Sequence, residues 1–274
     1  MIYIIKRAIC LVFLLSFTTL NAQKGYELGG WLGVSHYFGD LNTNQRIGKP
    51  GLAFGVAARY NFDTRISVRT SFNYGRVRAT DTDSQNNFER NRNLSFRSDI
   101  VDMTNVLEFN FFHYEHGSKT HNKTPYLFGG FNFMYFNPKA ELDGTIYNLR
   151  KLGTEGQTPG GEYGSLSGGL VLGGGYKWDV THTTSINLEF SMRFLFTDYL
   201  DDVSTVYPDK TQLGADRGPA AVALSDRSLI EGLGAANRQR GDKQGNDNFT
   251  FFGIGVMRYF GGIECPEISK PKWK

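Results

Sequence analysis

Cysteine is almost absent from this sequence, which contains only Cys10 and Cys265. Two thiols exclude a cysteine metal cluster and a disulfide-stabilised scaffold. Proline is scarce, at eight residues, and no stretch after residue 22 is long and apolar enough to cross a bilayer as a helix. The formal net charge of +3 is too small to support nucleic-acid binding, so we expect no nucleic-acid partner.

The first residues are typical of a secretory signal peptide. Lys6 and Arg7 precede an apolar run at residues 8–17, and Ala22 ends a small-residue cleavage site before Gln23. We therefore expect residues 1–22 to be removed, which lowers the formal charge of +3 by two, to +1. Cys265 is then the single thiol of the exported chain, and no internal disulfide can form.

What the sequence has in abundance is glycine, phenylalanine and tyrosine, with 33, 22 and 14 residues. Residues 185–196 show the dominant pattern, in which large apolar side chains occupy every second position. Successive residues of a strand point to opposite faces, so Glu189 and Arg193 share the polar face. One such segment fits a solvated sheet or a membrane barrel equally well. Its recurrence around a closed sheet decides between them.

The alternation recurs in eight segments, each long enough for a tilted strand to cross a bilayer. These segments are residues 26–38, 51–62, 66–74, 96–112, 125–137, 164–178, 185–196 and 248–260. We therefore predict an all-β fold, an eight-stranded antiparallel transmembrane β-barrel at residues 23–260, with a tail at 261–274. Residues 125–137 and 248–260 are apolar on both faces, so the pattern does not assign their inner side. The alternative is a soluble β-sandwich or lipocalin-like barrel, which would not turn so many aromatic side chains outward.

The connections between these segments alternate in length, as in outer-membrane barrels. Residues 63–65 and 179–183 are short connections and 113–124 is moderate, whereas 39–49, 80–93, 138–163 and 198–247 are mostly longer. We expect long extracellular loops, and short turns and both termini in the periplasm. Aromatic clusters at the turn side predict the inner interfacial girdle. Within residues 198–247 we expect one short helix at 225–233, with its apolar residues on the barrel mouth.

The side chains assigned to the barrel interior are charged in equal numbers. They are the acids Glu27, Asp102, Glu108 and Glu189, and the bases Arg59, Arg69, Lys177 and Arg193. An eight-stranded barrel is only wide enough for side chains. We therefore predict a mutually paired polar plug and a closed, non-conducting barrel.

The sequence does not assemble a catalytic site. His36 has the parity of an outward residue, and the remaining histidines, His113, His116, His121 and His182, fall in the turns. A hydrolase at the outer rim would need a histidine poised with a nucleophile or carboxylate there. The first three turn histidines have metal-capable spacing, and Asp198, Asp201, Asp202 and Asp209 could gather calcium. Both groups are better explained as solvated polar segments, so we expect no enzyme activity, metal or cofactor.

Three segments resemble a known family. Val34-Ser-His-Tyr-Phe-Gly-Asp-Leu-Asn42, Phe196-Thr-Asp-Tyr-Leu-Asp-Asp-Val-Ser204 and the tail with Cys265-Pro266 look like the PorG family. These are small outer-membrane barrels of the type IX secretion and gliding machinery. The resemblance implies a structural role, in which the barrel contacts a periplasmic ring of PorK-like lipoprotein and PorN-like protein. The alternative function is a surface-binding protein or lipid-modifying enzyme that acts through the long loops.

The candidate partner-binding residues lie in the first turn and the tail. Asp63 and Arg65 are the charges of the first turn, and the tail carries Lys270, Lys272 and Lys274 for an acidic partner or lipid surface. Cys265 is an odd cysteine in an oxidising compartment, which favours an intermolecular disulfide with a ring component. The expected partner is the PorK-like lipoprotein, and a disulfide between two copies of the chain is the alternative. A reduced thiol against the barrel rim is the competing interpretation.

Overall fold

The computed structural model describes residues 24–263. The predicted leader, Cys265 and the three tail lysines lie outside this range. Eight strands form the barrel wall: β1 (Gly25–Phe38), β2 (Gly51–Asn61), β3 (Ile66–Thr80), β4 (Ser95–Asn110), β5 (Lys123–Leu142), β7 (Leu166–Asp179), β8 (Thr184–Leu195) and β9 (Asn248–Gly261). Smaller elements are η1 (Asp81–Asp83), α2 (Asn87–Arg92), β6 (Thr145–Asn148), α3 (Leu149–Leu152), α4 (Lys210–Arg217) and α5 (Pro219–Ser225). No helix among the described residues is long and apolar enough to cross a membrane.

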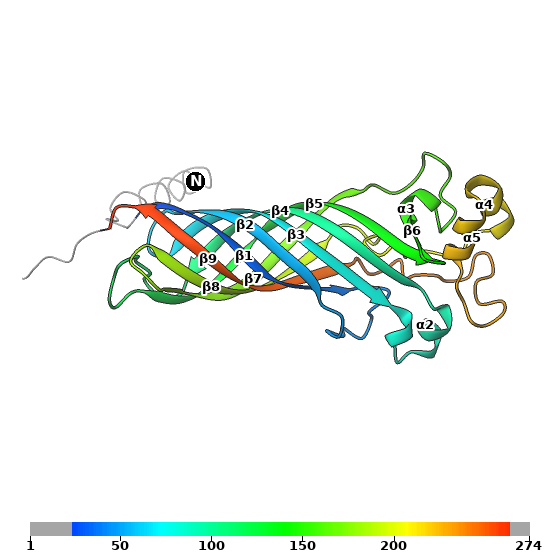
Figure 1. The fold of residues 1–274 in the computed structure, drawn as a ribbon, viewed down its shortest axis with the longest axis horizontal. Coiled ribbons are helices and arrows are strands. Elements are labelled where there is room, and N and C mark those ends of the chain that lie inside the picture. The colour runs from blue at the N-terminus through cyan, green and yellow to red at the C-terminus, as the bar shows by residue number, and fades with distance from the viewer. Residues whose placement is uncertain (1–23, 264–274) are drawn as a thin grey trace, which may run out of the picture.

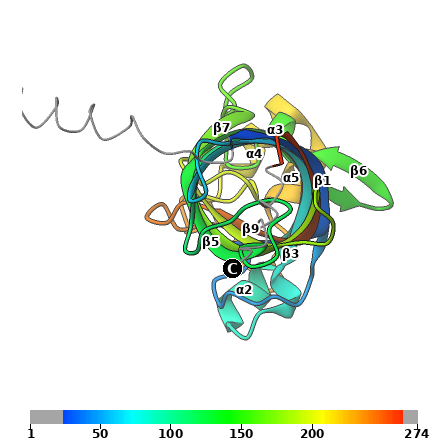
Figure 2. The ribbon, with the colours of Figure 1, turned by 90° about the vertical axis from the view of Figure 1, so that its left-hand side faces the viewer.

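The sheet closes on itself, which confirms the predicted eight-stranded antiparallel barrel. Each wall strand pairs with its neighbour along the chain, and β1 pairs with β9 along its whole length, from Gly25 to Phe38. Seen end-on, the strands form a ring (Figure 2). Closure satisfies the backbone groups that an open sheet edge would leave unpaired in lipid.

The two ends of the barrel differ sharply (Figure 1). One end, here called the turn end, carries residues 62–65, 111–122 and 180–183 together with the start of β1 and the end of β9. The opposite end, called the loop end, carries β6 and every helix within residues 24–263 (Figure 1). Residues 39–50, 81–94, 143–165 and 196–247 cover the mouth at the loop end and are called the cap. The alternation of short and long connections is therefore confirmed.

The outer wall is apolar and exposed. Leu32, Phe54, Phe72, Phe131 and Leu170 lie on five different strands, and each is between 45% and 62% exposed. Water does not tolerate so large an apolar surface, whereas bilayer hydrocarbon does. Near the turn end, outward aromatic rings approach each other, with the Tyr26 and Tyr60 centroids 4.8 Å apart. The chain is thus an outer-membrane-type β-barrel with the predicted interfacial girdle at its turn end.

The structure resolves the two strands that are apolar on both faces. Phe128, Met134 and Phe136 of β5 and Phe249 and Phe251 of β9 are buried inside the barrel. All but Phe128 belong to an apolar core that joins the inner wall near the loop end to Leu200, Val203 and Leu224 of the cap. The lumen is therefore polar toward the turn end and aromatic toward the loop end, where the cap packs on it.

Several predicted boundaries are wrong at the loop end. Strand β3 continues to Thr80 and β5 to Leu142, where β5 forms a hairpin with β6, a ninth strand that the sequence did not predict. The helix expected at residues 225–233 is also wrong. The helices of this loop are α4 and α5, which bury Leu213 and Leu224, while Leu229 and Ile230 are 70% and 50% exposed. Pro219 opens α5 because its fixed φ suits a first helical turn.

Candidate functional site

The lumen contains the predicted charge network, centred on Glu108. This carboxylate is fully buried and lies 2.8 Å from Nε of Arg59, 2.5 Å from Nε of Arg69 and 3.5 Å from Nζ of Lys177. Arg59 also pairs with Glu27 at 2.7 Å, and Arg69 with Glu189 at 2.8 Å. Buried charges persist only when they are paired. The network therefore fixes the relative positions of β1, β2, β3, β4, β7 and β8.

The space left between these side chains is small. One cavity of about 30 Å³ lies among residues that include Trp31, Arg69 and Asn187. That volume admits about one or two water molecules. The described lumen is therefore filled by side chains, as the balance of its charges predicted.

His116 closes the turn end of the lumen. Its side chain is 2% exposed, with Nε2 3.2 Å from Glu27 and Nδ1 3.0 Å from Asp179. Its ring stacks on Tyr259 at a centroid distance of 4.4 Å. Burial lowers the pKa of His116, but its bonds to Asp179 and Glu27 outweigh this and raise the pKa above the ordinary value. The expectation that His116 is a solvated turn residue is wrong, because the turn folds back into the barrel mouth.

The cap is held by carboxylates that the sequence analysis assigned to solvated segments. Asp201 and Asp202 are each 1% exposed. The hydroxyl oxygen of Tyr37, from β1, lies within hydrogen-bond distance of two carboxylates, Asp201 at 2.5 Å and Asp247 at 2.8 Å. The Tyr163 hydroxyl donates to Asp202 at 2.6 Å, and Thr154 also donates to Asp202. The prediction of a solvated segment is therefore wrong for this pair, because hydroxyl donors from distant segments cover it.

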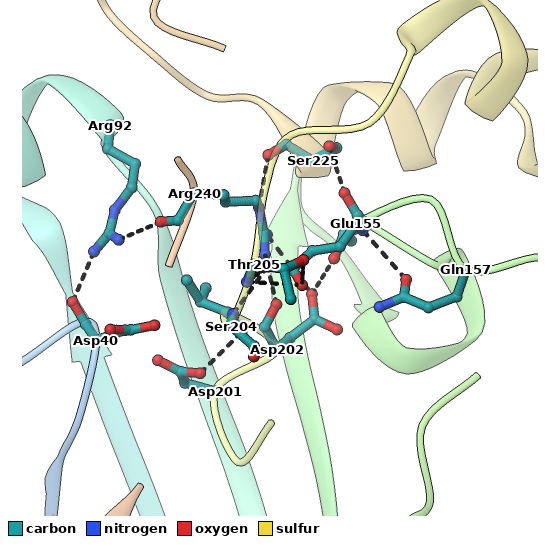
Figure 3. Close-up of polar contacts among 12 residues, drawn as sticks. Asp40, Arg92, Glu155, Gln157, Asp201, Asp202, Ser204, Thr205, Ser225 and Arg240 are labelled. Atoms are coloured by element: carbon teal, nitrogen blue, oxygen red, sulfur yellow. Dashed lines mark hydrogen bonds and ion pairs between the residues drawn. The ribbon is translucent and has the colours of Figure 1, made fainter. Parts of the chain in front are cut away.

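Two buried arginines complete the cap (Figure 3). Arg240 pairs with Glu155 at 3.1 Å and donates to the carbonyl of Asp202 at 2.5 Å. Glu155 also accepts from the backbone N–H groups of Ser204 and Thr205 at 2.9 and 3.0 Å. The loop segments 143–165 and 196–247 are thereby fastened to each other.

Arg92 fastens α2 to the same assembly. Its guanidinium pairs with Asp81 at 2.8 Å. It also donates to the carbonyl oxygens of Asp40 and Arg240 at 2.8 and 2.6 Å (Figure 3). The first loop, α2 and the last loop therefore meet at one side chain. The segment that resembles the PorG family at residues 196–204 lies within this cap and has a structural task there.

Burial changes the protonation of the cap carboxylates. Burial raises the pKa of Asp202 to about 6, although Arg240 and two hydroxyl donors act in the opposite direction. Burial also raises the pKa of Asp198 to about 8, and the neighbouring carboxylates add to the effect. The cap therefore takes up protons near neutral pH. Within residues 24–263, no group of three potential ligands is arranged to hold a metal ion.

The two predicted site residues of the first turn, Asp63 and Arg65, form hydrogen bonds with backbone groups of the turns. One oxygen of Asp63 accepts from the backbone N–H groups of Arg65 and Ile66 at 2.6 and 2.7 Å. The Arg65 guanidinium donates to the carbonyl of Phe111 at 2.9 Å. Both side chains remain half-exposed. They hold two neighbouring turns together, a role that the sequence analysis did not consider.

One hydroxyl–imidazole contact was missed by the sequence analysis. Thr64 Oγ1 lies 2.9 Å from Nδ1 of His113 at the turn end. The contact is exposed, and within residues 24–263 no carboxylate forms an ion pair with His113 that would orient its imidazole. A nucleophile needs such an oriented base in a water-excluded site. The contact therefore supports no catalytic assignment.

Comparison with known proteins finds one family and several barrels. The family model for DUF6089, a domain of unknown function, matches residues 6–215. No curated protein matches the chain. Among solved structures, OprG of Pseudomonas aeruginosa is 11% identical with a TM-score of 0.45, and covers 88% of this chain and 98% of its own. Neisserial surface protein A is 11% identical with a TM-score of 0.43, covering 86% and 97%. Ail of Yersinia pestis is 10% identical with a TM-score of 0.40, covering 88% and 100%.

Proposed function

The chain belongs to the DUF6089 family, and from that premise we propose that it is an outer-membrane anchor of the type IX secretion and gliding machinery. In this proposal the turn end faces the periplasm and contacts a ring of PorK-like lipoprotein and PorN-like protein. The loop end faces the cell exterior. The tail with Cys265 and its lysines, which lies outside the described residues, adds a second periplasmic contact.

One observation favours an anchor over a channel or a transporter. The paired charges around Glu108 fill the lumen, His116 closes one end and the cap closes the other. A barrel without a passage acts through its surfaces. The resemblance of three segments to the PorG family supports the proposal that this surface contacts the type IX secretion machinery.

A cross-linking experiment separates the two ends. A photoreactive residue at Lys119, exposed at the turn end, should cross-link to the ring proteins in living cells. The matched position is Lys243, which is exposed at the loop end and should give no ring cross-link. Cross-links to the ring from position 243 alone would reverse the proposed orientation, and none from either position or from the tail would remove the ring contact.

The charges of the first turn permit a sharper test. Asp63→Asn keeps an oxygen that can accept from the turn N–H groups but loses the charge. Asp63→Ala loses both the charge and the turn bonds. If the charge contacts the ring, both variants should reduce secretion of a type IX cargo. A defect in Asp63→Ala alone would assign Asp63 to turn stability and withdraw it as a partner contact.

A surface-binding function is the second candidate, and one observation favours it. In the cap, the side chains of Leu229 and Ile230 are exposed, and the backbone N–H of Leu229 donates to the carbonyl of Asn91 in α2 at 2.8 Å. Exposed apolar pairs on ordered loops are common in interaction sites. Replacing both residues with asparagine should leave secretion unchanged under the anchor proposal. Loss of secretion with the barrel still inserted would favour the surface-binding function.

A further inference from the structure

The outer wall of β3, β4 and β5 changes character in ordered steps toward the loop end. Directly paired outward residues form four successive rows across these strands. The rows are Phe72–Met103–Phe133, then Tyr74–Val101–Tyr135, then Arg76–Asp99–Asn137, and finally Arg78–Arg97–Lys139. The wall thus passes from apolar to aromatic to mixed to wholly cationic.

The last row places three cations directly opposite one another. Arg78 pairs in register with Arg97, and Arg97 with Lys139. Like charges at paired positions destabilise a sheet unless an anion lies between them. Lys139 has one carboxylate, Asp99 at 3.0 Å, which it shares with Arg76 at 2.7 Å. Arg78 and Arg97 form no ion pair with any of the described residues.

This cation row lines a surface groove. The groove has a volume of about 350 Å³ and is bordered by Lys49 of the first loop, the three cations of the row and one carboxylate, Glu141. Lys49 is partly neutralised by Asp83 at 2.6 Å. Arg78 and Arg97 therefore supply the excess positive charge, and arginine binds phosphate oxygens in a bidentate geometry.

The position of the row relative to the lipid identifies the source of the phosphate. Arg78 lies four positions after Tyr74, a distance of about 13 Å along a strand and about 10 Å along the axis of a tilted barrel. Aromatic side chains lie at the lipid headgroup level, and the apolar row lies next to the acyl chains. An amphiphile with acyl chains on the wall would therefore carry its phosphates to the cation row.

We propose that this groove binds a phosphate of a phosphorylated glycolipid in the outer leaflet. The proposal rests on the proposed orientation, in which the loop end faces the cell exterior. Arg78 and Arg97 are the binding residues, while Lys139 and Lys49 add positive charge. Free phosphate would gain the same cations but no contact with the wall below them.

Binding is measured by native mass spectrometry of the folded full chain in detergent. The probes are diphosphorylated lipid A, the same lipid without phosphates, and inorganic phosphate. Wild-type protein should retain the phosphorylated lipid. Arg78→Gln with Arg97→Gln should lower its occupancy about tenfold, and heat-modifiable migration verifies that the barrel is folded. The matched control is Arg258→Gln, an exposed outward cation at the turn end, which should bind like wild type.

Three outcomes would overturn the groove as a lipid phosphate site. They are equal binding of the dephosphorylated lipid, equal loss in Arg258→Gln, and competition by inorganic phosphate at the concentration of the lipid. Surface labelling of Lys49→Cys on intact cells tests the orientation separately. Phosphate-specific binding without labelling would support the groove as a lipid phosphate site and overturn the orientation in the proposed function. Phosphate-specific binding with labelling would support both the site and the orientation.

Discussion

Glu108→Gln tests whether the lumen network holds the barrel together. The carboxylate of Glu108 is fully buried and contacts Arg59, Arg69 and Lys177. The amide that replaces it retains the shape of the side chain and loses the charge. The lumen then holds four bases against the three acids Glu27, Asp102 and Glu189.

The magnitude follows from the cost of a buried charge without its partner. Removing one member of a buried ion pair lowers the free energy of unfolding by about 3–5 kcal/mol. The free energy of unfolding of a small protein falls by about 1–3 kcal/mol for each molar increase in urea concentration. Glu108→Gln should therefore lower the urea midpoint by about 2 M.

Heat-modifiable migration in lipid vesicles reports the folded fraction at each urea concentration. The matched control is Glu141→Gln, which removes an exposed carboxylate of β5 and should change the free energy of unfolding by less than about 0.5 kcal/mol. A second variant, Glu108→Gln with Lys177→Met, removes one acid and one base together. It should recover part of the lost stability because the lumen charges balance again.

Two results would refute this reasoning. A midpoint change in Glu108→Gln no larger than in Glu141→Gln would mean that the network contributes little to stability. A further loss in the double variant would mean that packing by Lys177, whose Nζ lies 4.9 Å from the Tyr126 ring centroid, matters more than charge balance.

Three further predictions concern the cap and the tail. Arg240→Met leaves Glu155 buried without its base, so it should expose residues 205–239 to protease while the barrel stays folded; unchanged digestion would contradict the assigned role. Because the pKa of Asp202 is raised from 3.8 to about 6, the cap should gain stability as pH falls from 7 to 4. Hydrogen exchange of the cap residues measures this gain, and Asp202→Asn should weaken its dependence on pH. For Cys265, outside the described residues, non-reducing electrophoresis should show a slower species that reductant and Cys265→Ser both remove; thiol-trapped cells without that species would leave only non-covalent contact.

The wall of the barrel could be predicted because strand periodicity is a local property. Alternation assigned Arg69, Glu108 and Arg193 to the lumen, and the structure buries all three. It failed for the inner face of β5 because Phe128, Met134 and Phe136 are as apolar as the lipid-facing residues beside them. The sequence of one strand does not show whether an aromatic side chain packs under the cap or faces lipid.

The cap could not be predicted because its contacts join residues far apart in the sequence. Asp202 has the same local sequence whether it is solvated or covered by Tyr163 and Arg240. His116 likewise gains its burial from Glu27 and Asp179, which no spacing within the turn reveals. The row of Arg78, Arg97 and Lys139 needed the register of three strands before its charges could be placed together.

The contacts of Tyr37 have a consequence for the order in which the molecule assembles. Its hydroxyl meets Asp201 and Asp247, which follow it by 164 and 210 residues in the chain. Contacts of such separation form late, because long loops must first be closed. Asp247 directly precedes β9, and β1 pairs with β9 over the same separation, so the contact of Tyr37 with Asp247 forms together with the closure of the wall. Protease resistance of residues 205–239 should therefore report the closure of the barrel by β1 and β9.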